Sequence, residues 1–147
     1  MLIPASKRAD IANAVNAANE AKKDREILEA ASYAIPRARE MFEEGIERSA
    51  SKGCRSFAEC LGECVLLALE EKYGREYPGK YDWKLWFEGY RIDSNRGRFV
   101  NDMWGRMIDE LLLDLQDNGY ETKCKSEYVR YEITAQNLAD RKLKVSW

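Results

Sequence analysis

The chain has 147 residues, of which 45% are hydrophobic and 34% are charged, a composition that excludes a disordered tail and a membrane-embedded protein. Its 24 basic and 26 acidic side chains leave a formal charge of −2, so no overall basic field attracts nucleic acid. The sequence contains no histidine, which removes the commonest general base and the commonest metal ligand. A chain of this length is expected to fold as one domain over residues 1–147.

The first helix is predicted over residues 9–34, which are rich in Ala, Glu and Lys. Its apolar stripe is narrow and suits packing against a single neighbour, within the chain or in a second copy. We therefore expect residues 1–34 to support self-association, as in a homodimer. Pro36 is expected to end or kink this helix, because proline clashes with the preceding turn.

Three further helices are predicted downstream. One spans residues 36–51, and the next begins at a capping box formed by Ser56 and Glu59 and runs to Tyr73. Another spans residues 98–118 and ends at Asn118-Gly119. Between them, residues 82–90 fit either a short strand or a short helix.

The C-terminal part changes character. Residues 120–124, 128–134 and 143–147 carry aromatic and β-branched side chains at a spacing of two, which predicts strands. The fold class is therefore α+β, with a helical body of three to four helices followed by a small C-terminal antiparallel β-sheet.

The four cysteines are Cys54, Cys60, Cys64 and Cys124. No secretory signal is recognisable at the start, and the longest apolar run is far too short to span a bilayer. A cytoplasmic protein with free thiols and no membrane contact is thus expected. A zinc site is the alternative, but only Cys60 and Cys64 approach the usual ligand spacing, so no metal and no cofactor is predicted.

Catalytic signatures are missing from the sequence. Nucleophilic triads lack their base, and no phosphate-binding glycine loop or zinc-protease motif occurs. Acidic side chains on polar helix faces are expected to be solvated rather than to act as an acid–base pair. A non-enzymatic binding protein is therefore predicted, with no catalytic residues.

Two segments are candidate binding surfaces. In residues 75–107, aromatic rings alternate with basic side chains, a composition found at interface hot spots and at base-stacking sites. The competing interpretation is that half of these rings fill the core. The end of the last helix is wholly acidic, and its carboxylates either form a solvated face or meet a basic partner. The predicted partner- or ligand-binding residues are Trp83, Trp86, Tyr90, Arg91, Arg96, Arg98, Asp109, Glu110, Asp114 and Asp117.

The end of the chain resembles small bacteriophage-encoded proteins. The resemblance lies in LLLDLQDNGY at residues 111–120, in LKVSW at residues 143–147, and in the helix-to-glycine turn ERSASKG at residues 47–53. Proteins of this kind include inhibitors of host defence, such as anti-CRISPR proteins, and binders of nucleotide second messengers. The resemblance implies a phage product acting inside a bacterium.

The preferred function is an inhibitor that occupies the surface of a bacterial host protein. A second hypothesis is sequestration of a nucleotide second messenger through Arg91, Arg96 or Arg98 and a stacking ring. A third is direct nucleic-acid binding, whose affinity should fall steeply with salt.

Overall fold

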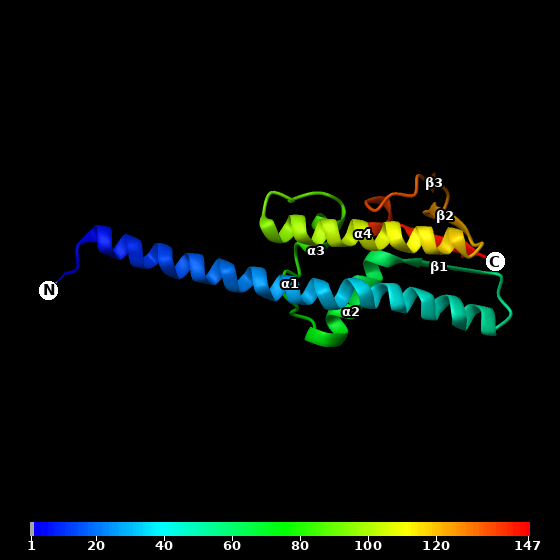
Figure 1. Ribbon diagram of the computed structural model, residues 1–147, viewed down its shortest axis with the longest axis horizontal. Helices are drawn as coiled ribbons and strands as arrows, with labels where there is room; N and C mark the ends of the chain where they lie inside the picture. Colours follow the sequence, from blue (N-terminus) through cyan, green and yellow to red (C-terminus); the bar gives the residue numbers. More distant parts are fainter. Residues whose placement is uncertain (1) are drawn as a thin grey trace.

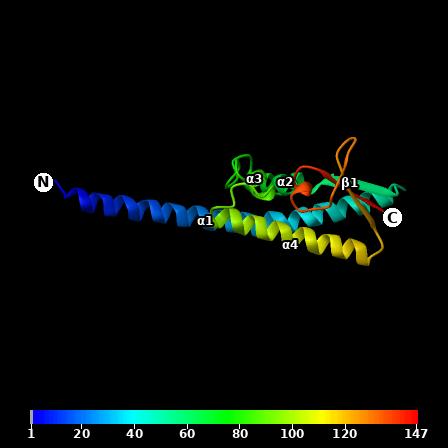
Figure 2. The same ribbon diagram turned by 90° about the horizontal axis from the view of Figure 1, so that it is seen from above.

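One helix, α1 (Ala5–Ser51), runs the whole length of the molecule (Figure 1). The computed structural model describes residues 2–147. Residues 5–23 of α1 are exposed throughout and project beyond the remainder of the protein, whereas burial begins at Ile27 (Figures 1 and 2). We call residues 5–23 the N-terminal arm.

Pro36 does not end the first helix, so the prediction of two helices separated there is wrong. It lies exposed on the solvent side of α1, while Ala34, Ile35 and Ala38 are buried on the other side. Proline removes one backbone hydrogen bond, but α1 packs against both α2 (Leu61–Tyr73) and α4 (Asn95–Asp117) around this position. This packing keeps the helix continuous, and the helix curves along its length (Figure 2).

The predicted capping box at Ser56 is also wrong, because these residues form the strand β1 (Ser56–Cys60). All five residues of β1 pair with β4 (Lys142–Ser146), a strand more than eighty positions away in sequence. Phe57 meets Phe42 edge-on, with ring centroids 5.3 Å apart, and its ring lies over Gly45 of α1. The distant pairing and this contact outweigh the local helix signal.

The middle of the chain adopts helical structure. Residues 82–90, left open by the sequence, contain the short helix α3 (Trp83–Phe87). Helix α4 begins three residues earlier than predicted, because the Ser94 hydroxyl accepts a hydrogen bond from the Gly97 amide at 3.1 Å and caps it.

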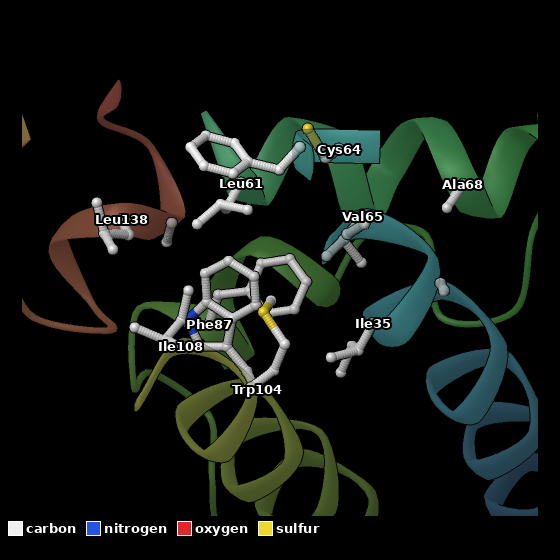
Figure 3. Close-up of a cluster of buried hydrophobic side chains, with 14 of the residues drawn as sticks. Ile35, Leu61, Cys64, Val65, Ala68, Phe87, Trp104, Ile108 and Leu138 are labelled. Atoms are coloured by element: carbon white, nitrogen blue, oxygen red, sulfur yellow. The ribbon is translucent and has the colours of Figure 1, made fainter. Parts of the chain in front are cut away.

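The hydrophobic core lies where α1, α2, α3 and α4 meet (Figure 3). Phe87 stacks on Trp104 with ring centroids 4.5 Å apart. Two of the buried tryptophans donate their indole N–H to backbone carbonyls: Trp104 to Ala135 at 2.8 Å, and Trp83 to Pro78 at 2.6 Å. The indole donors of Trp83 and Trp104 are therefore buried with partners.

The sheet has the order β1-β4-β2-β3, with antiparallel pairing throughout. Strand β2 (Glu121–Lys125) and β4 agree closely with prediction, whereas the predicted strand at residues 128–134 shortens to β3 (Arg130–Tyr131). A short 3₁₀ helix, η1 (Asn137–Ala139), precedes β4. The inner face of the sheet packs on α1 through β1 and on α4 through β2.

The α+β class is confirmed, with four α-helices and a four-stranded antiparallel sheet in residues 2–147. The helices do not all precede the strands, because β1 follows α1 directly and becomes an edge of the C-terminal sheet. No helix within the described residues combines the length and the apolar character needed to cross a bilayer.

The four cysteines are free thiols in the structure: Cys54 is exposed, and Cys60, Cys64 and Cys124 are buried. Burial of Cys60 and Cys64 confirms the prediction that these two pack as small apolar side chains, and Cys124 packs in the same way. Across residues 2–147, no cluster of three or more Cys, Asp or Glu side chains is placed to hold a metal ion.

Candidate functional site

Two of the predicted surface aromatics are core residues. Trp83 is 0% exposed and Trp86 is 2% exposed, so neither ring can stack on a ligand or reach a partner. Sequence reasoning placed them on a surface because the ring-rich segment alternates with basic residues. The competing interpretation, that these rings fill the core, is the correct one for both.

The arginines of the same segment have internal partners. Arg96 pairs with Glu20 and with Asp24, the latter at 3.0 Å, and so fastens the start of α4 to the base of the N-terminal arm. Arg91 pairs with Asp82 at 3.0 Å. Arg98 donates to the Ile92 carbonyl at 3.1 Å. Each of these three arginines therefore links two parts of the chain.

Tyr90 remains exposed, with 62% of its surface accessible. It lies beside Arg91, whose backbone has a positive φ of 52°. The structure therefore brings no stacking platform together from the predicted set, because the exposed ring has only an ion-paired arginine next to it.

The acidic end of α4 is divided. Asp109, Glu110 and Asp117 are exposed, whereas Asp114 pairs with Arg39 of α1. Arg39 also pairs with Glu43 at 2.8 Å. Hydrogen bonds to Asp114 and Glu43 raise the pKa of Arg39 above its usual value, since both carboxylates stabilise the charged form.

A groove of about 590 Å³ lies between α1 and α4 around this pair. Its charged side chains are Arg39, Glu43, Glu47 and Asp114. Glu43 and Asp114 already bind the guanidinium of Arg39, which is the one cation in the lining of this groove. The Arg39–Asp114 pair therefore links α1 to α4. Its acidic rim includes Asp114, from the acidic helix end noted in the sequence.

The strongest feature of the surface lies on the outer face of the sheet. In β4, buried Leu143 and Val145 alternate with Lys142 and Lys144, so the two lysines share the outer face of the sheet. In β2, Lys123 and Lys125 come directly before and after buried Cys124, so they also lie on the outer face. The register sets Lys123 directly opposite Lys144, and Lys125 opposite both Lys142 and Arg130. The basic sheet face comprises Lys123, Lys125, Arg130, Lys142 and Lys144.

Like charges that face each other across strands destabilise a sheet. Side chains that face each other across two strands have Cβ atoms about 4.5–5.5 Å apart. Within residues 2–147, none of the five cations has a carboxylate oxygen within 4.0 Å that would offset this repulsion. Lysines often protect exposed edge strands from aggregation, but four of these five residues lie on β4 and β2, the two central strands. Edge protection can act at Lys123, because β3 pairs only with Cys124 and Lys125 of β2, but it does not explain Lys142 and Lys144 on β4, which has a paired strand on each side.

The outer face is open to solvent. The connection from β3 to β4 crosses on the helix side, where Ala135 accepts a hydrogen bond from Trp104 and Leu138 is buried. Arg141, at the end of this connection, stacks on Tyr131 with its guanidinium carbon 3.9 Å from the ring centroid and pairs with Asp140 at 2.9 Å. The hydrogen bond from Arg141 lowers the pKa of Tyr131. Arg141 is thus satisfied internally, unlike the five cations outside.

Sequence reasoning missed the basic sheet face, although it carried a signal. Lysine recurs at alternate positions in both 121–125 and 142–146, which predicts one basic face for each strand. The pairing that joins the two faces is long-range and cannot be read from either segment alone.

No protein-family model, no curated protein and no solved structure matches this chain. The resemblance to small bacteriophage proteins therefore stays a prediction, and the case for a function depends on the geometry.

Proposed function

We propose that the protein is a non-enzymatic binding protein that holds nucleic acid by its phosphate backbone on the basic sheet face. The observation that carries this proposal is the pair of direct cross-strand oppositions, Lys123 with Lys144 and Lys125 with Lys142. A row of opposed cations costs stability when unoccupied, and a polyanion converts the same row into favourable contacts.

The spacing of the cations favours a polymer over a single anion. Neighbouring lysines on one strand are two residues apart, which corresponds to about 6.7 Å along the strand. The basic sheet face spreads over β4, β2 and β3, so one phosphate cannot neutralise it. The nucleotide hypothesis is less well supported, because the arginines on which it depended have partners within the chain.

Binding of labelled oligonucleotides, single-stranded and duplex, tests the proposal by fluorescence anisotropy over a salt series. If four to five phosphates are neutralised, log affinity for a single strand should fall with log salt with a slope of about −3. Salt-insensitive binding, or none, would contradict the proposal.

A matched pair of variants locates the site. Lys123→Gln with Lys144→Gln should weaken binding at least tenfold and flatten the salt slope by about one unit or more. Lys22→Gln with Lys23→Gln removes the same charge from α1, where both lysines are exposed and pair with neighbouring glutamates. Equal loss in the two variants would show that net charge matters, rather than the sheet face.

A second candidate function, an inhibitor of a bacterial defence protein as the phage resemblance implies, is favoured by the N-terminal arm. Ile11 and Val15 are 56% and 53% exposed on the N-terminal arm, which projects beyond the remainder of the protein. A pull-down from bacterial lysate with wild type and with an Ile11→Asp, Val15→Asp variant tests it. A stoichiometric protein recovered by wild type alone supports it, and failure to recover one contradicts it.

A further inference from the structure

A pocket at the β2–β3 turn adjoins the basic sheet face. The turn is closed by a hydrogen bond from the Ser126 amide to the Val129 carbonyl at 3.1 Å. The pocket has a volume of about 220 Å³, and turn residues Glu127, Tyr128 and Val129 line it together with Lys123, Lys125, Lys144 and Arg130. The turn therefore borders the cations on the same side of the sheet.

Tyr128 contributes nothing to the core. It is 94% exposed, the highest value among the large hydrophobic side chains of residues 2–147, and its neighbour Val129 is 52% exposed. An aromatic ring with open faces next to a row of cations is the arrangement by which proteins hold single-stranded nucleic acid: the ring stacks on a base and the cations follow the backbone.

Resting on the proposed function, we infer that Tyr128 stacks on one unpaired base in this pocket, so that the ligand is single-stranded rather than duplex. Pockets that enclose a whole small ligand measure roughly 300–1,000 Å³, so the space here suits part of a ligand. Bases in a duplex are already stacked and do not reach such a ring.

Glu127 fits the same arrangement. A carboxylate next to Tyr128 repels phosphate but accepts hydrogen bonds from the exocyclic amino group of a base. The turn thus presents an aromatic ring and an acceptor to the base, while the central strands present cations to the backbone.

Three ligands of equal length separate the parts of this inference: a single-stranded oligonucleotide, its duplex, and an abasic sugar–phosphate strand. Wild type should bind the single strand most tightly, and Tyr128→Ala should lower that affinity on the order of 5- to 100-fold. The abasic strand should bind both proteins equally, and Tyr128→Phe should retain wild-type affinity because stacking needs only the ring.

Tyr81→Ala is the matched control, since Tyr81 is also highly exposed, at 83%, and lies beside a lysine. It should bind like wild type. If Tyr128→Ala leaves single-strand affinity unchanged, or the abasic strand binds as tightly as the natural one, the stacking inference is overturned while the backbone proposal stands. If no strand binds at all, both are overturned.

Discussion

Lys123 and Lys144 occupy opposite positions on β2 and β4, and neither ammonium group has a carboxylate oxygen within 4.0 Å. In a sheet shaped only for stability, one member of such a pair would be acidic, or β-branched to pack against its neighbour. The choice of lysine at four adjacent central positions therefore points to a ligand with negative charge.

The opposition of lysines gives a test in which stability and binding change in opposite directions. Lys144→Glu replaces a repulsive pair with an attractive one, so the free energy of unfolding should rise by a few tenths of a kcal/mol, up to about 1 kcal/mol. Affinity for a single-stranded oligonucleotide should fall. Urea unfolding and anisotropy measure the two effects, and a loss of stability would contradict our account of the sheet face.

Two glycines in helices should respond oppositely to alanine. A Cβ at Gly62 would lie 1.9 Å from the Ala139 carbonyl oxygen, so Gly62→Ala should destabilise the protein by about 1–3 kcal/mol by pushing η1 away from α2. At Gly105, in α4, a Cβ meets nothing within 4 Å, and Gly105→Ala should stabilise by about 0.5–1 kcal/mol. Thermal unfolding of both variants checks this, and equal effects would show that the α2–η1 contact is looser than described.

The thiols should react in a fixed order. Burial raises the pKa of Cys64 to about 12, because the thiolate is disfavoured away from water, and it also raises the pKa of Cys60. Exposed Cys54 should therefore be modified in the folded protein at pH 8. The three buried thiols should react only after the protein unfolds. Rapid modification of two or more thiols in the folded protein would contradict this order.

The same raised pKa links the stability of the protein to pH. The folded Cys64 thiol has a higher pKa than the unfolded one, so its contribution to stability is complete below the unfolded value near 9. That contribution should decline as pH rises toward 12. Unfolding measured between pH 8 and pH 11 should show this alkaline loss, and a Cys64→Ala variant should show less of it.

Among the elements, local signals predicted some helices and strands well and misplaced others. The ends of α2 and α4, and strands β2 and β4, follow from glycine stops and from alternation of residues. Strand β1 was not predictable, because five residues that resemble a helix start are held by β4 and by Phe42. The continuity of α1 through Pro36 likewise depends on packing with α2 and α4.

The N-terminal arm carries the exposed apolar side chains on which the predicted self-association of residues 1–34 depends. The arm makes no contact with the body that would bury Ile11 or Val15, so a second copy could cover both. Light scattering at tens of micromolar should give more than the monomer mass of 17.0 kDa, and Ile11→Asp with Val15→Asp should restore the monomer. The variant should keep the unfolding midpoint of the wild-type body, and a monomeric wild type would show the prediction to be wrong.

For the whole molecule, a charge of −2 hides a strong separation of charge. Carboxylates line the groove between α1 and α4, and the inner face of the sheet packs on those helices. The basic sheet face points the other way, toward solvent. Overall composition alone therefore argued against nucleic-acid binding, whereas the arrangement of the same residues in space supports it.

The candidate site was predictable only in part. Exposed Tyr90 and the acidic residues Asp109, Glu110 and Asp117 lie on the surface as expected, but they do not converge with one another on a common site. The lysines converge through register, which depends on contacts between residues 123 and 144. Sequence periodicity predicts which face of its strand each lysine occupies, but only the fold shows which residue lies opposite it on the next strand.

The most direct test of the basic sheet face is a map of backbone amide chemical shifts during titration with a single-stranded oligonucleotide. Our account predicts that shifts concentrate in β2, β4 and the turn that contains Tyr128. Amides of the N-terminal arm and of the segment from Tyr90 to Arg98 should stay unchanged. Shifts centred on those regions, or none at saturating oligonucleotide, would contradict the assignment of this face as the binding site.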